Sequence, residues 1–75
     1  MTSLLTVPVG KQARLISMNG ALRTKLLQYG LHVGDFIRVL RLAPLGGPML
    51  IEVNSREIAL GRGVAEKIFV ELECE

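Results

Sequence analysis

The chain has few of the side chains on which catalysis and metal binding depend. Its 75 residues contain one histidine, one cysteine and no tryptophan. Cys74 has no partner for an intrachain disulfide, which fits a reducing compartment. His32 has no histidine or cysteine near it in the sequence, whereas a bound metal usually takes three or four protein ligands. We therefore predict no metal site within the chain, and leave open a surface ion near His32 or Cys74 shared between molecules.

Motifs for nucleotide binding and nucleophilic catalysis are also missing. The glycines at 46, 47, 61 and 63 lack the lysine and the strand–helix context that let a glycine-rich loop bind phosphate. Ser3, Ser17 and Ser55 have no recognisable base, because His32 is the single histidine. We expect a protein that is not an enzyme, has no cofactor and acts by binding.

Long hydrophobic runs are absent as well. The longest is a few residues, far short of the roughly 20 that span a bilayer. The N-terminus has no basic residue ahead of its short apolar stretch, and Pro8 and Gly10 interrupt the residues after it, unlike a signal peptide. Hydrophobic residues still make up 49% of the chain, enough for the core of one small domain over residues 1–75. We expect a cytoplasmic protein without membrane insertion.

The net charge of +2 is small, but the charges are unevenly distributed. Residues 1–47 hold six basic and one acidic side chain, whereas residues 48–75 hold three basic and six acidic ones. Ordinary solvated surface charge explains this pattern. The alternative is single-strand nucleic-acid binding, which requires Phe36 and Phe69 to be exposed for stacking and Arg38 and Arg41 to contact phosphates.

The spacing of apolar residues predicts one helix, between Asn19 and Gly30. Asn19 is a suitable N-cap, and Gly30 suits the left-handed position that ends a helix. Leu22, Leu26 and Tyr29 form one apolar stripe, so we expect Tyr29 to lie in the core.

Short segments rich in Val, Ile and Phe predict five strands. They cover Lys11–Ser17, Asp35–Leu42, Met49–Asn54, Arg56–Leu60 and Ile68–Leu72. Residues 44–48 form a loop, Asn54-Ser55 a tight hairpin turn, and residues 61–67 a short helical turn before the last strand. We predict a mostly β fold, a small closed or partly open barrel with one inserted helix.

Several of these strands are apolar on both faces. Alternation lets one set fill the interior, namely Ile37, Val39, Met49, Ile51 and Val53. It leaves a second set on the outer faces, namely Ile16, Phe36, Leu40, Leu50 and Phe69. One helix cannot cover every outer face of so small a chain. We therefore predict that part of the second set forms an interaction surface; the alternative is that the helix and loops cover it.

Ordered segments of the chain resemble the FeoA-type domain family. Leu-Leu-Gln-Tyr-Gly-Leu-His-Val-Gly at 26–34 is similar to its L-L-x-x-G-L-x-x-G segment, and Ala-Pro-Leu-Gly-Gly-Pro at 43–48 is similar to its A-P-L-G-D-P loop. Ala-Glu-Lys-Ile-Phe-Val at 65–70 matches its A-x-x-I-x-V ending. The chain departs from the pattern at Gly47, often an acid, at Tyr29, often leucine, and at Gly61, usually basic.

The resemblance implies an SH3-like barrel and a role in bacterial ferrous iron uptake. FeoA proteins are small cytoplasmic regulatory or assembly proteins that accompany FeoB, a membrane permease with a cytoplasmic GTP-binding domain. The same fold also occurs behind a DNA-binding domain in iron-dependent repressors. Since this sequence starts at Met1 without such a domain, we expect a stand-alone protein that neither carries iron nor hydrolyses GTP.

We predict docking on FeoB, or on further copies of the chain, through the helix surface, the 44–48 loop and the outer strand faces. The residues are Arg23, Lys25, Leu27, Phe36, Leu40, Pro44, Leu45, Leu50 and Phe69. Leu27 lies off the apolar stripe, either packed under a loop or exposed. Leu45 is the sharpest candidate, because a leucine at a loop tip has little internal reason to be there unless it plugs a barrel end. A nucleic-acid-binding barrel and a generic peptide-binding SH3-like module are the alternatives.

Overall fold

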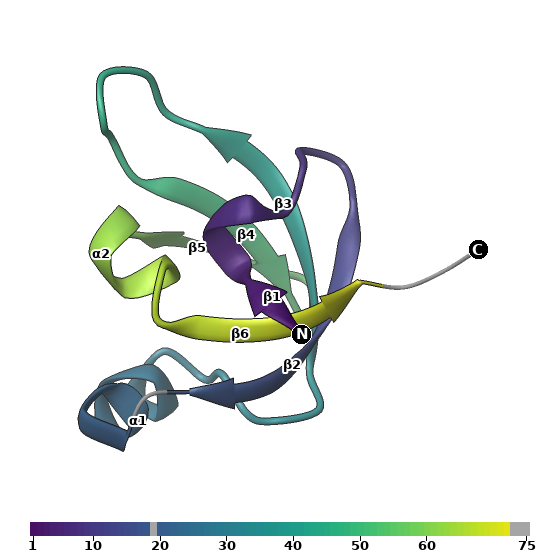
Figure 1. The fold of residues 1–75 in the computed structure, drawn as a ribbon, viewed down its shortest axis with the longest axis vertical. Helices are drawn as coiled ribbons and strands as arrows, with labels where there is room; N and C mark the ends of the chain where they lie inside the picture. Colours follow the sequence, from purple (N-terminus) through teal and green to yellow (C-terminus); the bar gives the residue numbers. More distant parts are fainter. Residues whose placement is uncertain (19, 73–75) are drawn as a thin grey trace.

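The computed structural model describes residues 1–18 and 20–72, which form one curved sheet with two short helices (Figure 1). In chain order the elements are β1 (Thr2–Ser3), the 3₁₀ turn η1 (Leu4–Thr6), β2 (Gln12–Met18), α1 (Gly20–Gln28), β3 (Phe36–Leu42), β4 (Met49–Val53), β5 (Arg56–Leu60), α2 (Arg62–Ala65) and β6 (Ile68–Leu72). The strand order is β1-β6-β2-β3-β4-β5, and every pairing is antiparallel. The mostly β fold with one inserted helix and a short helical turn before the last strand is confirmed.

The first strand, β1, adds a sixth strand to the five predicted. Thr2 pairs with Val70 and Ser3 with Phe69, so the N-terminus extends the sheet beyond β6. The Ser3 hydroxyl accepts from the amide of Leu5 at 3.3 Å and donates to the carbonyl oxygen of Glu66 at 2.9 Å. These bonds turn the chain into η1, which buries Leu4 completely.

The core is built mainly by alternation along the central strands. All five side chains predicted to fill the interior, Ile37, Val39, Met49, Ile51 and Val53, are at most 1% exposed. Ala13 and Leu15 of β2 and Ile68 and Val70 of β6 join them from the other side of the barrel. In β4 every second residue is buried, and the same alternation runs through Ala13 and Leu15 of β2, Ile37 and Val39 of β3, and Ile68 and Val70 of β6. The burial of one face along these segments fixes their register.

Helix α1 ends through a backbone motif that Gly30 makes accessible. Gly30 has a φ of 85°, its amide donates to the Leu27 carbonyl, and the Leu31 amide donates to the Leu26 carbonyl, both at 3.0 Å. Leu26 and Leu31, which this motif brings together, are both fully buried. The helix end at Gly30 is therefore confirmed.

The environment of Tyr29 differs from the prediction. Tyr29 was expected in the core, but it is 38% exposed because the helix ends at Gln28 and the chain turns away before the apolar stripe can continue. The predicted N-cap, Asn19, lies outside the described residues. No helix in the described part of the chain has the length and apolar character needed to cross a membrane.

Candidate docking surface

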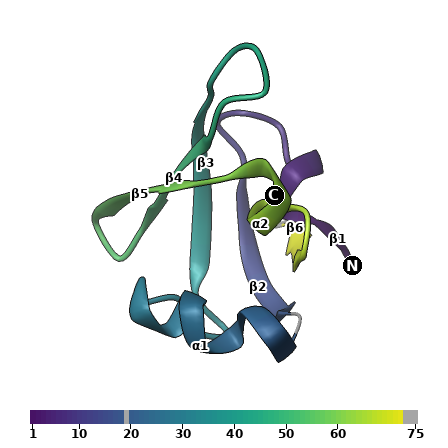
Figure 2. The same ribbon diagram turned by 90° about the vertical axis from the view of Figure 1, so that its left-hand side faces the viewer.

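The loop between β3 and β4 projects from the top of the molecule, beyond the end of the sheet (Figures 1 and 2). Its tip is Leu45, whose side chain is fully exposed, and Pro44 beside it is exposed as well. The alternative in which Leu45 folds back to plug a barrel end is thus excluded. A large apolar side chain stands in water with no internal contact to explain it.

The backbone of this tip is left-handed at two consecutive residues. Leu45 has a φ of 58° and Gly46 a φ of 75°, and the Gly47 amide donates to the Pro44 carbonyl at 3.1 Å. This is the pattern of a type I′ turn, in which Asn, Asp or Gly usually occupies the first central position. A leucine there costs about 1–2 kcal/mol, because its Cβ crowds the following carbonyl oxygen.

The base of the same loop is held by an arginine from a distant part of the chain. Arg62, at the start of α2, donates from Nε to the Gly47 carbonyl at 3.0 Å and from Nη2 to the Ala43 carbonyl at 2.9 Å. The Ala43 amide also donates to the Pro48 carbonyl at 3.0 Å. Sequence reasoning missed Arg62, because its acceptors are backbone carbonyls that no side-chain pattern reveals.

The predicted outer-face side chains do not form one continuous patch. Phe36 is 51% exposed, whereas Leu40, Leu50 and Phe69 are half-buried. Leu40 occupies an irregularity of β3 next to the cross-strand pair of Arg41 and Leu50. Phe69 lies apart from them on β6, between β1 and β2.

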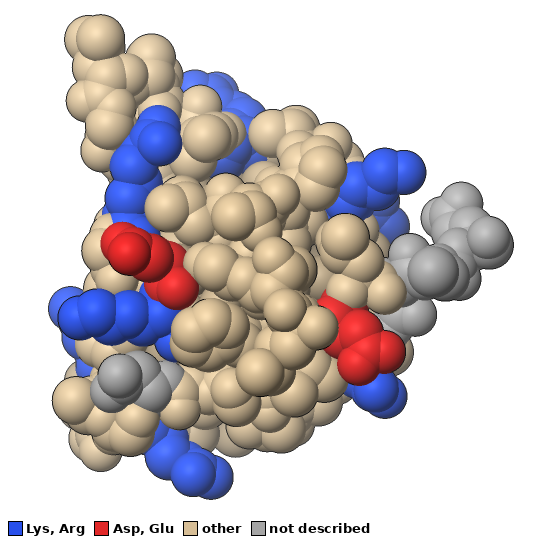
Figure 3. Space-filling view, viewed as in Figure 1, with Lys and Arg blue, Asp and Glu red and all other residues tan. Residues whose placement is uncertain are grey.

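Helix α1 carries the remaining predicted residues, and it lies at the opposite end of the molecule from the 43–48 loop (Figure 2). Arg23, Lys25 and Leu27 are all exposed, Leu27 at 44%, so Leu27 is not packed under a loop. In the space-filling view, basic side chains are spread around the rim of this face, acidic side chains lie at its left and right flanks, and the centre is uncharged (Figure 3). A partner that contacts both regions must therefore span most of the 31 Å long axis.

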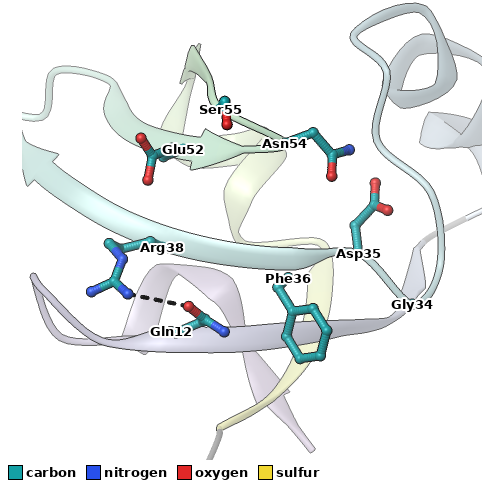
Figure 4. Close-up of a pocket in the computed structure, with 8 residues that line it drawn as sticks. All are labelled: Gln12, Gly34, Asp35, Phe36, Arg38, Glu52, Asn54 and Ser55. Atoms are coloured by element: carbon teal, nitrogen blue, oxygen red, sulfur yellow. Dashed lines mark hydrogen bonds between the residues drawn. The ribbon is translucent and has the colours of Figure 1, made fainter.

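A polar groove of about 290 Å³ opens on the outer face of β3 and β4 (Figure 4). Its lining residues are Gln12, Gly34, Asp35, Phe36, Arg38, Glu52, Asn54 and Ser55. Arg38 already donates to the Gly10 carbonyl at 3.3 Å and to the Gln12 side chain at 3.2 Å, and Asp35 accepts from the His32 amide at 2.9 Å. Within residues 1–18 and 20–72, no three His, Cys, Asp or Glu side chains gather where an ion could bind.

The groove also bears on the nucleic-acid alternative, which needs two stacking platforms and free cations. Phe36 is exposed beside the groove, but Phe69 is half-buried on another strand, and Arg38 is engaged with the backbone. The two aromatic side chains are therefore not both exposed for stacking, although Arg41 is exposed. Cys74, the second residue considered for a surface ion, lies outside the described residues.

Comparison with known proteins shows a match over nearly the whole chain. Residues 2–72 match the model of the FeoA domain family. A curated relative, the putative Fe(2+) transport protein A of Methanocaldococcus jannaschii, is 38% identical over 47 residues, which are 63% of this chain and 55% of that protein. The match thus spans about half the length of that relative.

Solved structures of the same kind share the fold. The crystal structure of an iron uptake regulatory protein, FeoA, superposes with a TM-score of 0.84 at 29% identity over 96% of both chains. The solution structure of the FeoA protein from Chlorobium tepidum has a TM-score of 0.86 at 32% identity, covering 97% of this chain and 71% of the other. The predicted SH3-like barrel is therefore confirmed.

Proposed function

This chain belongs to the FeoA domain family, and on that premise we propose that it is a cytoplasmic accessory protein of ferrous iron uptake that docks on the cytoplasmic region of a FeoB-type permease. The names of its relatives, an Fe(2+) transport protein and an iron uptake regulatory protein, support the link to iron. In this proposal the chain regulates or assembles the permease and neither carries iron nor hydrolyses GTP.

The observation that carries the proposal is the fully exposed Leu45 at the tip of the 43–48 loop. Interfaces draw most of their binding energy from a few side chains that enter well-packed pockets on the partner. Leu45 is presented in this way, because it projects beyond the sheet and contacts nothing in its own chain. We propose that it inserts into an apolar pocket of the permease.

Exposed basic residues suggest a second contact with the same partner. Arg23 and Lys25 stand on α1, which bears no acidic residue in its first turn. Charges at the rim of an interface mainly accelerate association and set orientation. We propose that α1 orients the chain while the 43–48 loop provides affinity.

A binding assay with the cytoplasmic region of the FeoB-type permease tests the proposal. We expect Leu45→Asp to weaken binding at least about tenfold, because a desolvated carboxylate replaces an apolar anchor. Arg23→Glu should slow association, most clearly at low salt. Val9→Asp, which also charges an exposed apolar side chain but lies outside the predicted surface, is the matched control. Unchanged binding by folded Leu45→Asp and Arg23→Glu chains would contradict the proposal.

A further inference from the structure

Arg62 is the single side chain whose hydrogen bonds tie the 43–48 loop to the rest of the fold, among the residues that the structure describes. Its two acceptors, the carbonyls of Ala43 and Gly47, lie on either side of the turn that presents Leu45. One planar guanidinium therefore bridges both arms of the loop at its base. The bridge connects residues 19 and 15 positions apart, so it is a tertiary contact and not part of the turn itself.

The turn needs such support, because its own sequence favours a different backbone. Leu45 occupies a left-handed position that leucine rarely adopts, and no side-chain bond within the turn compensates for it among the described residues. Strained residues of this kind persist only where the surroundings hold them in place. The hydrogen bonds from Arg62 and the flanking prolines supply that constraint.

We infer that Arg62 is a positioning residue, which keeps the Leu45 turn formed before any partner binds. The guanidinium suits this role, because its donors have a fixed planar geometry and hydrogen bonds from a charged donor are stronger than neutral ones. Arg62 is half-buried, so water competes less for its donors than at a fully exposed site. Nε and Nη2 are both engaged with carbonyls of the loop, so these two bonds orient the guanidinium toward the base of the turn.

A preformed tip has a definite consequence for affinity. Ordering a loop during association subtracts from the binding free energy, and a loop that is already rigid avoids that loss. Removal of the Arg62 bonds should therefore weaken docking through Leu45 without changing the contact itself. The claim that a partner binds Leu45 rests on the proposed function. The claim that Arg62 keeps the turn rigid is independent of it.

The first measurement needs no partner. Backbone order parameters of residues 45–47 should be about 0.85 in the parent chain, as in rigid structure, and below about 0.6 in Arg62→Lys, which cannot reach both carbonyls in the same plane. Arg62→Gln keeps one amide donor but loses the positive charge and the paired donors of the guanidinium. It should lower the same order parameters to a similar value. Arg56→Lys is the matched control, since Arg56 donates to a single carbonyl, that of Tyr29 at 3.2 Å, away from the loop. Unchanged order parameters in both folded Arg62 variants would overturn the inference.

The second measurement is a double-mutant cycle with the cytoplasmic region of the FeoB-type permease. Arg62→Lys should weaken binding about tenfold when Leu45 is present, the size expected for a charged hydrogen bond, and should have no further effect in Leu45→Ala. An equal loss in both backgrounds would show that Arg62 contacts the partner directly and would overturn its positioning role. If the parent chain does not bind the permease, the proposed function fails, and the order parameters alone decide the inference.

Discussion

At the scale of single residues, residues 1–18 and 20–72 contain two turns with consecutive left-handed residues outside glycine pairs, and they differ in how well their sequences suit this backbone. The β4–β5 hairpin places Asn54 and Ser55 at φ values of 52° and 65°, and asparagine is favoured at the first of these positions. The 43–48 loop places Leu45 at φ 58°, where leucine is disfavoured. The same backbone geometry is therefore occupied once by a residue that favours it and once by a leucine that does not, which agrees with the proposed role of Leu45 in docking.

This contrast predicts opposite effects for two reciprocal substitutions. Leu45→Asn should raise the free energy of unfolding by about 0.5–1 kcal/mol, and Asn54→Leu should lower it by a similar amount. Thermal unfolding checks both, with expected Tm changes of several degrees in opposite directions. Leu45→Asn should at the same time lose permease binding, so that the free energy of unfolding rises while the affinity for the permease falls. A Leu45→Asn chain less stable than the parent would show that the leucine turn is not strained.

At the scale of elements, α1 is held to the core by few side chains for its length. It has nine residues, of which Leu26 is fully buried and Leu22 packs partly buried against the core. Helices this short are marginal without tertiary contacts. The Leu26 carbonyl also accepts from the Leu31 amide where the helix ends, and both side chains are fully buried. Leu26 therefore contributes both to the packing of α1 and to its C-terminal end. The position of the basic residues on α1 therefore depends mainly on Leu26, with Leu22 as a second, partly buried contact.

We accordingly expect Leu26→Ala to lower the free energy of unfolding by about 2–4 kcal/mol. Hydrogen exchange should show that α1 amides lose protection first, while β3 and β4 keep most of theirs, because the helix can detach as a local unit. Ile51→Val in the centre of β4 is the control, since it should lower protection throughout the sheet. Uniform loss of protection in Leu26→Ala would contradict a separate helix unit.

How far the sequence predicts these elements depends on the kind of signal each one leaves. The strands from residue 35 onward were predicted to within a residue, because Ile37, Val39, Met49, Ile51 and Val53 alternate so clearly. The two-residue β1 leaves no periodic pattern and was missed. The prediction that Tyr29 lies in the core was wrong, because the spacing of apolar residues does not show at which residue the helix ends.

The candidate site was predictable only in part for a related reason. A leucine between two prolines marks Leu45 as a loop tip, which the structure bears out. Its left-handed backbone and its support by Arg62 leave no trace in the sequence, because both are properties of the backbone reached through tertiary folding. Sequence patterns report side-chain burial well and contacts between a side chain and a distant carbonyl poorly.

At the scale of the whole molecule, the sheet is open at two edges, β1 and β5. β1 has only two residues, whereas β5 presents a longer edge to solvent that carries Glu57. Glu57 lies directly opposite Glu52 on β4, and no basic side chain of the described residues forms an ion pair with either. Like charges in this position destabilise a sheet, but a charge on an edge strand also discourages pairing with another chain.

Two substitutions of Glu57 separate these effects. Glu57→Lys and Glu57→Val should both relieve the repulsion and raise the free energy of unfolding by about 0.2–1 kcal/mol. Sedimentation at increasing concentration should show new self-association for Glu57→Val alone, because only that change removes the edge charge. Equal association by both variants, or by neither, would contradict the protective role of Glu57.

The bonds of Arg62 to the 43–48 loop have a further consequence for how the protein can change over evolutionary time. Their acceptors are peptide carbonyls, which every residue possesses whatever its side chain. A substitution at position 45 therefore leaves the two hydrogen bonds of Arg62 in place. It also leaves no cavity in the core, because Leu45 is fully exposed. Under the proposed docking, residue 45 can therefore change together with a diverging partner while the rest of the domain stays the same.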